Sequence, residues 1–330
     1  MRKLVKTAII ATAGYVALSL SNPIADLVQK IFSNPNVNNT PIVEIAKQDT
    51  SETENYNGKL RVVLVSGAPF AQYIRFARIR EELANKGSLE RILNSTESTP
   101  KQSLLHQAAS YDWNQVCEDD RIRFLRDITR FEQSLDRSMP SDAEVHKLPY
   151  NPKNGRDNYD STMSVLKEIS SEATSDDTLL FVYSGHGSPG GGSLLIGNNE
   201  KYPGNQSYCL SPEVLCDIAE HTKGRKIFIL SSCGAGVNTE ELKKENLEKT
   251  TIITITSQKG FGYAYFAGNP EEANMNFIPS LADSLNPKGD LLKAFKTAAE
   301  VYNQRVRQKR DFDGGAPAFY STAKSHDLYP

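Results

Sequence analysis

The segments FVYSGHG (residues 181–187) and IFILSSCGAG (residues 227–236) decide the fold of this chain. Each begins with an unbroken apolar run rich in β-branched and aromatic residues, which is typical of a strand buried in a parallel sheet. Each ends in small residues and one reactive side chain, His186 in the first and Cys233 in the second. Because open α/β sheets place their functional sites at the carboxyl ends of the strands, we expect His186 and Cys233 to lie close together there.

Further strand-like and helix-like segments surround these two in a regular alternation. Strands are predicted at residues 59–66, 143–149, 178–183, 226–230 and 250–256. Helices are predicted at residues 71–83 and 158–172, from Ser211 onward, and after Asp290. This order predicts an α/β fold with a mainly parallel sheet that is covered by helices on both faces.

Composition divides the chain into three parts. Residues 1–21 have the pattern of a signal peptide or membrane anchor, and residues 22–58 are polar and indicate a flexible linker or pro-segment. Residues 59–330 form the predicted main domain. Within it, residues 87–140 are polar and helix-patterned and interrupt the alternation of strands and helices, so we expect a helical insertion packed beside the sheet.

The N-terminus predicts export. Residues 1–6 are basic and residues 7–20 carry no charge, which is the order of a secretory signal. The signal is either cleaved or retained as an anchor through residues 4–20, and the expected location is secreted or membrane-anchored on the extracytoplasmic side. A buried amphipathic helix is less favoured, because Arg2, Lys3 and Lys6 all lie at one end.

Charge and histidine spacing exclude several function classes. The formal net charge of −2 gives no electrostatic reason to expect a nucleic-acid partner. His106, His146, His221 and His326 have no metal-like spacing, so no metal or organic cofactor is expected. Residues 185–190 fit the G-x-G-x-x-G template, but Pro189 and the glycines cannot open the helix that a dinucleotide site needs.

A histidine beside a cysteine suggests nucleophilic catalysis. An imidazole can take the proton of a thiol and so produce the thiolate that attacks a carbonyl carbon. The backbone N–H groups of Gly187 and Cys233 are candidates for an oxyanion hole. The alternative is structural, with Cys233 as a small buried apolar residue and His186 held by a core hydrogen bond. Two apolar strands that each end in a reactive group favour catalysis.

The same two blocks, FVYSGHGS and IFILSSCGAG, resemble the signature blocks of the caspase-like clan of cysteine peptidases. That clan includes caspases, metacaspases, legumains, gingipains and the catalytic subunit of GPI transamidase, and the layout here is most similar to legumains. The resemblance implies a caspase-like catalytic domain over residues 59–330 and a peptide or protein substrate. It also implies His186 as general acid and base and Cys233 as the nucleophile that forms a thioester.

The resemblance extends to a substrate pocket. Ser257 and the aromatic run with Tyr263 and Tyr265 are similar to the legumain segment that lines the pocket for the P1 side chain, the residue before the cleaved bond. Legumains carry acids where this chain has Gly234 and Gly268, so a preference for asparagine is not implied.

The charge at the base of that pocket decides between two kinds of substrate. Arg75 at the base would favour an acidic P1 side chain, whereas Glu271 or Glu272 would favour a basic one. We favour the basic preference, because the two glutamates directly follow the aromatic segment.

Three functions remain from the sequence. The first is an exported cysteine endopeptidase, and the second is an enzyme with the same residues that passes the acyl group to an amine. Both share the acyl-enzyme step, so the sequence does not separate them. The third is a catalytically silent caspase-like scaffold that uses residues 87–140 as a binding surface.

Overall fold

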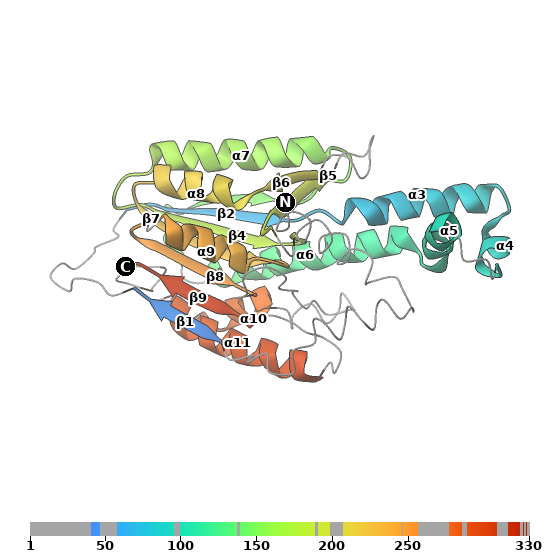
Figure 1. Ribbon diagram of the computed structural model, residues 1–330. Helices are drawn as coiled ribbons and strands as arrows, with labels where there is room; N and C mark the ends of the chain where they lie inside the picture. Colours follow the sequence, from blue (N-terminus) through green and yellow to red (C-terminus); the bar gives the residue numbers. More distant parts are fainter. Residues whose placement is uncertain are drawn as a thin grey trace, which may run out of the picture.

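The computed structural model describes residues 41–46, 58–95, 100–136, 139–188, 191–198, 207–245, 247–256, 277–285, 289–308, 316–323, 326 and 328. Within these residues, one sheet of seven strands runs through the middle of the molecule in the order β1-β9-β8-β7-β4-β2-β3 (Figure 1). Its strands are β1 (Ile42–Ile45), β2 (Leu60–Ser66), β3 (Glu144–Leu148), β4 (Thr178–Ser184), β7 (Arg225–Ser231), β8 (Thr250–Thr254) and β9 (Ala318–Ser321).

The sheet is mainly parallel. Every neighbouring pair of its strands runs in the same direction except β8 and β9, which are antiparallel. A separate hairpin of β5 (Leu194–Asn198) and β6 (Ser207–Leu210) follows β4. The predicted α/β class with a mainly parallel sheet is therefore confirmed.

Helices cover both faces of the sheet. On the upper face in Figure 1 lie α7 (Gly155–Glu172) and α8 (Pro212–His221), and α9 (Gly236–Lys244) contributes to the same core. The other face is covered by α10 (Phe277–Asp283), α11 (Leu291–Gln308) and the second half of α6 (Trp113–Leu135). The expectation of a sheet covered on both faces is confirmed.

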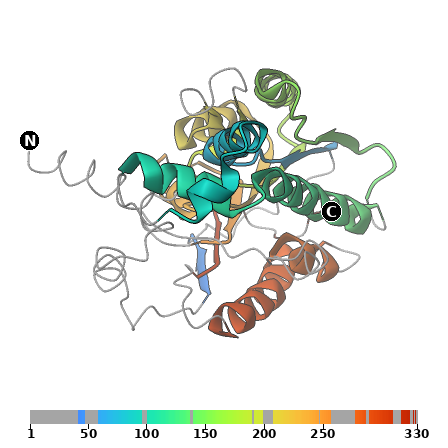
Figure 2. The same cartoon turned by 90° about the vertical axis from the view of Figure 1, so that its right-hand side faces the viewer.

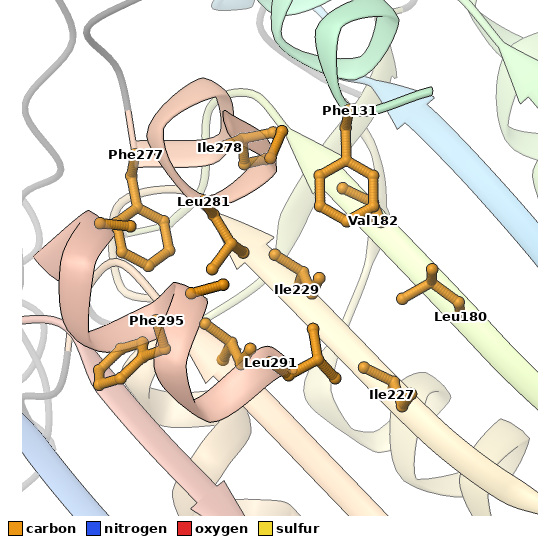
Figure 3. Close-up of a cluster of buried hydrophobic side chains, with 14 of the residues drawn as sticks. Phe131, Leu180, Val182, Ile227, Ile229, Phe277, Ile278, Leu281, Leu291 and Phe295 are labelled. Carbon is orange, nitrogen blue, oxygen red and sulfur yellow. The ribbon is translucent and has the colours of Figure 1, made fainter. Parts of the chain in front are cut away.

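Alternate residues of the central strands supply the two cores. Leu180 and Val182 of β4 lie with Ile227 and Ile229 of β7 in the cluster under α6, α10 and α11, which Figure 3 shows. The residues between them face the opposite way, and Phe181 packs with α7 and α8. Because successive side chains of a strand point to opposite faces, a strand covered on both sides must be apolar throughout. That requirement explains the unbroken apolar runs of the sequence.

The predicted helical insertion is also present. It contains α4 (Leu89–Leu93), α5 (Pro100–Ser110) and α6, and with α3 (Ala71–Asn85) it extends beyond the carboxyl ends of the strands (Figures 1 and 2). The projecting helices share a small core of their own, formed by Phe76, Ala77, Ala108 and Trp113. The insertion therefore has two parts, an outer helical cluster and the half of α6 that packs on the sheet.

The N-terminal region differs from the expected linker in one place. Residues 42–45 form β1, which pairs in parallel with the edge strand β9. A strand of four residues depends on backbone hydrogen bonds to a partner far along the chain. Within a polar segment, the local sequence pattern therefore does not indicate it. Residues 1–40 lie outside the described residues, and no described helix is long and apolar enough to cross a membrane.

Candidate active site

The pairing of β4 with β7 brings the two signature segments together. Ser184 lies opposite Ser231 as the last pair of the parallel ladder, and the N–H of Gly185 donates to the Ser231 carbonyl at 3.1 Å. His186 and Cys233 each follow two residues beyond that last pair. Both reactive side chains therefore leave neighbouring strands at the carboxyl edge of the sheet, as the sequence predicted.

Glycines at these strand ends permit a very close approach of the two segments. A Cβ atom on Gly187 would clash with the Cys233 carbonyl oxygen and lie 2.9 Å from the Ser232 Oγ. Gly234, directly after the cysteine, has a φ angle of 68°, which glycine adopts without strain. The small residues are thus required by the packing of the two segments against each other.

Gly187 also forms part of the contact with the β5–β6 hairpin. It faces Leu194 in an isolated antiparallel bridge, and the bonds on either side run from Leu195 N to His186 O and from Ser188 N to Ser193 O. This pattern makes Gly187 and Leu194 a non-hydrogen-bonded pair. The Gly187 N–H therefore points away from the hairpin.

Aromatic rings hold the His186 imidazole in place. Phe70 stacks on it with ring centroids 3.8 Å apart and 24° between the planes, and the Phe124 ring meets it edge-on at 5.1 Å. Tyr73 of α3 lies at 6.1 Å in a similar edge-on arrangement. Only 12% of the His186 side chain is exposed. The ring has little freedom to leave this orientation.

A carboxylate that our sequence reasoning missed completes the surroundings of the histidine. Asp120 Oδ2 lies 2.7 Å from His186 Nε2, and the Asp120 side chain is 6% exposed. Arg123, one turn further along α6, approaches the other carboxylate oxygen at 3.7 Å. The available signal was an acid pair, Asp120 and Asp127, on the face of α6 that also buries Phe124 and Phe131. Buried acids on an apolar helix face require partners.

Tyr73 lies in the same electrostatic environment. Burial is the main cause that raises the pKa of its phenol to about 12, and the nearby Asp120, Cys117 and Cys233 raise it further. Its hydroxyl therefore stays protonated near neutral pH. Tyr73 of α3 thus lies near the groups of the candidate site, and its ring contacts His186 edge-on.

A cavity of about 390 Å³ opens beside Gly187. Its walls include Phe70 and Phe76 from the α3 region and Leu195 and Cys209 from the hairpin. Arg75 is the one charged side chain among the described residues that line it. The predicted pocket residues Ser257, Tyr263, Tyr265, Glu271 and Glu272 lie outside the described residues.

The other three cysteines lie in environments that oppose ionisation. Burial, with a contribution from Asp120, raises the pKa of Cys117 to about 12. Burial raises the pKa of Cys209, and burial together with nearby glutamates raises that of Cys216 to about 11. No disulfide forms among the described cysteines. No group of three or more possible metal ligands gathers among the described residues.

No protein-family model matches this chain, and no curated protein matches it. Among solved structures it is similar to the crystal structure of the caspase drICE, with 14% sequence identity and a TM-score of 0.36 over 88% of this chain and 92% of that one. The strand order, the parallel pairing and the helices on both faces define an α/β fold with a mainly parallel sheet.

Proposed function

We propose that this protein is a cysteine endopeptidase in which Cys233 is the nucleophile and His186 the general acid and base. The observation that carries the proposal is the register of β4 and β7, which sets both residues two positions beyond the last paired serines. The tight contact of Gly187 with residues 232–233 supports it, because it keeps the two loops together. The substrate is a peptide or protein, and we propose no cofactor and no nucleic-acid partner.

The proposed reaction proceeds through an acyl-enzyme. The Cys233 thiolate attacks the carbonyl carbon of the peptide bond, and His186 carries the thiol proton. When the C–N bond breaks, His186 gives that proton to the leaving amine, and a thioester remains on Cys233. Water then attacks the thioester carbonyl with His186 as base. The carboxylic acid leaves, and the thiol is restored.

The developing negative charge on the carbonyl oxygen needs hydrogen-bond donors. We propose the backbone N–H groups of Gly187 and Cys233 for this role. The Gly187 N–H is not used by the hairpin, since Gly187 and Leu194 form a non-hydrogen-bonded pair. A donor that is already oriented costs no reorganisation when the charge develops.

We further propose that the cavity beside Gly187 binds the P1 side chain of the substrate. Because Arg75 is the charged side chain among the described residues that line it, we propose an acidic preference in place of the basic one that the sequence favoured. Arg75→Ala should lower turnover of peptides with Asp or Glu at that position about tenfold and leave neutral peptides unchanged. A positional peptide library read by mass spectrometry measures this. Arg78→Ala, an exposed arginine on the same helix, is the control. A basic preference in the wild type would instead favour Glu271 or Glu272.

Two other functions use the same fold. Transfer of the acyl group to an amine shares every step up to the thioester, and mass spectrometry of products formed with an added amine separates it from hydrolysis. A silent scaffold would not need the close contact of Gly187 with the cysteine loop.

We also propose that the protein is exported, as a secreted or membrane-anchored enzyme. The support is the basic segment at residues 1–6 followed by the uncharged segment at residues 7–20. Protease protection of the full-length chain in intact cells tests the location.

The central experiment compares Cys233→Ala and His186→Ala with the wild type on a peptide library and on unfolded casein. Each change should lower kcat/KM at least about 1,000-fold with the fold intact by circular dichroism. Cys216→Ala and His221→Ala, both on α8, are the matched controls and should keep wild-type activity. Full activity in Cys233→Ala or His186→Ala would end the proposal.

A further inference from the structure

The helical insertion contributes directly to the surroundings of the candidate catalytic histidine. Asp120 lies on α6, 66 positions before His186 in the chain, and its Oδ2 is 2.7 Å from the ring Nε2. We propose that Asp120 is a positioning residue, which fixes the orientation and the tautomer of His186 for the reaction. This inference rests on the proposed peptidase function and adds a third residue to it.

The hydrogen bond between Asp120 and His186 is buried, and neighbouring side chains hold both partners in place. The side chains of Asp120 and His186 are 6% and 12% exposed, so water competes little for their hydrogen bond. Arg123 stands 3.7 Å from Asp120 Oδ1, so the carboxylate has a second partner on its own helix. Phe70 and Phe124 hold the ring from its face and its edge. Rotation of the imidazole would break the hydrogen bond and both ring contacts together.

A second buried contact fixes α6 on the strand that carries the histidine. The Ser184 hydroxyl donates to Asp127 Oδ2 at 2.6 Å, and both residues are fully buried. Asp120 and Asp127 are seven residues apart, about two helical turns, so they lie on the same face of α6. The helix is thus tied to β4 at Ser184 and to the loop after it at His186. The position of the Asp120 carboxylate follows from this docking.

The ring nitrogen that contacts Asp120 decides which nitrogen of His186 can accept a proton. A neutral imidazole has one N–H and one lone pair, and an ionised carboxylate can only accept a hydrogen bond. Asp120 therefore holds the N–H on Nε2, which leaves the lone pair of Nδ1 to take the proton of the Cys233 thiol. When His186 becomes an imidazolium, the same carboxylate stabilises its charge.

Two variants test the proposal. Asp120→Asn keeps the size of the side chain and removes its charge, and Asp120→Ala removes the acceptor. We expect kcat to fall about tenfold or more in the first and about 100-fold in the second, with KM within about threefold of wild type. Asp119→Asn is the matched control, since Asp119 is the neighbouring acid on α6 and bonds to Gln115. It should keep wild-type kcat.

A spectroscopic measurement is independent of activity. In the full chain with Cys233→Ala and ¹⁵N-labelled histidine, nitrogen–proton correlation spectra report the tautomer of each neutral ring, and His186→Ala identifies the signal. We expect the Nε2–H form for His186, and a mixture of both forms when Asp120→Ala is added. A purely structural Asp120 would leave that spectrum unchanged. An Nδ1–H form, or unaltered spectra together with near-wild-type kcat in both Asp120 variants, would overturn the inference.

The two proposals fail in different ways. Activity that survives Cys233→Ala contradicts the peptidase function whatever Asp120 does. Activity that is lost in Cys233→Ala but kept in Asp120→Ala leaves the peptidase function standing and removes only the role of Asp120.

Discussion

Three of the four thiols of this protein lie in surroundings that oppose their ionisation, and the fourth lies at the strand edge beside His186. Cys117, Cys209 and Cys216 lie where burial raises their pKa values, and Cys117 and Cys216 also have acids nearby that oppose a thiolate. Cys233 instead follows the strand beside the one that carries His186. At the scale of single residues, position and environment therefore separate one cysteine from the other three.

The separation predicts selective alkylation of Cys233. With a pKa of about 12, Cys117 is a thiolate in about one molecule in 10⁴ at pH 8, and Cys216, with a pKa of about 11, in about one in 10³. We expect limiting iodoacetamide to modify Cys233 at least about tenfold faster than the other three, and His186→Ala to slow it. Peptide mass spectrometry over a time course measures the four rates. Equal rates would instead favour the silent scaffold.

Among the elements, α6 connects the insertion with the sheet. Its second half buries Ile128, Phe131 and Leu135 in the core, and its first half carries Asp120 to His186. A packed helix is rigid over this length, so the apolar contacts at one end determine where a side chain lies at the other. The insertion thus contributes a residue to the candidate site and is more than a separate binding surface.

The Asp127–Ser184 hydrogen bond should anchor this element. Ser184→Ala leaves a buried carboxylate short of a donor, so we expect the free energy of unfolding to fall by about 1–3 kcal/mol. A double-mutant cycle with Asp127→Ala should give a coupling energy of about 1–3 kcal/mol. Urea unfolding monitored by circular dichroism supplies the four values. Asp119→Ala, a less buried acid on the same helix, should show no coupling to Ser184→Ala, and additive effects of Asp127 and Ser184 would contradict the anchor.

At the scale of the whole molecule, the candidate site lies at one edge of the sheet, and a buried lysine that lowers the stability of the fold lies at the opposite edge. Lys226 lies at the amino end of β7, whereas Cys233 follows its carboxyl end. Burial, and to a lesser degree the nearby Lys249, lowers the pKa of Lys226 to about 8. The fold therefore disfavours the charged amine, and this part of the stability can be changed without touching the site.

Replacing this lysine should stabilise the protein at neutral pH. The pKa of Lys226 is about 8 in the fold against an ordinary value of 10.5, so the penalty is fully present below pH 8 and fades as the pH rises to 10.5. Lys226→Met should therefore raise the free energy of unfolding at pH 7 by up to about 3 kcal/mol, with a smaller gain at pH 10. Thermal unfolding at both pH values measures the gain, and Lys223→Met is the exposed control. A gain that does not depend on pH would contradict the burial of a charge.

The sequence determined the sheet and the edge at which two reactive residues lie. Runs such as residues 179–183 and 227–230 are apolar because both faces of the strand are covered, and a parallel sheet brings the ends of β4 and β7 to one edge. His186 and Cys233 follow those ends directly, so local pattern was sufficient to predict that they share an edge. The same reasoning identified the insertion, whose polar helical pattern breaks the alternation.

Only the tertiary structure decided what surrounds the histidine. Asp120 meets His186 across 66 positions of chain, and that contact depends on how α6 packs along β4, which no local pattern records. The pairing of β1 with β9 depends in the same way on a partner more than 270 positions away. Strand propensity and small residues act over a few neighbours and can be read from the chain, whereas a buried hydrogen bond between distant side chains or an added edge strand exists only once distant surfaces have packed together.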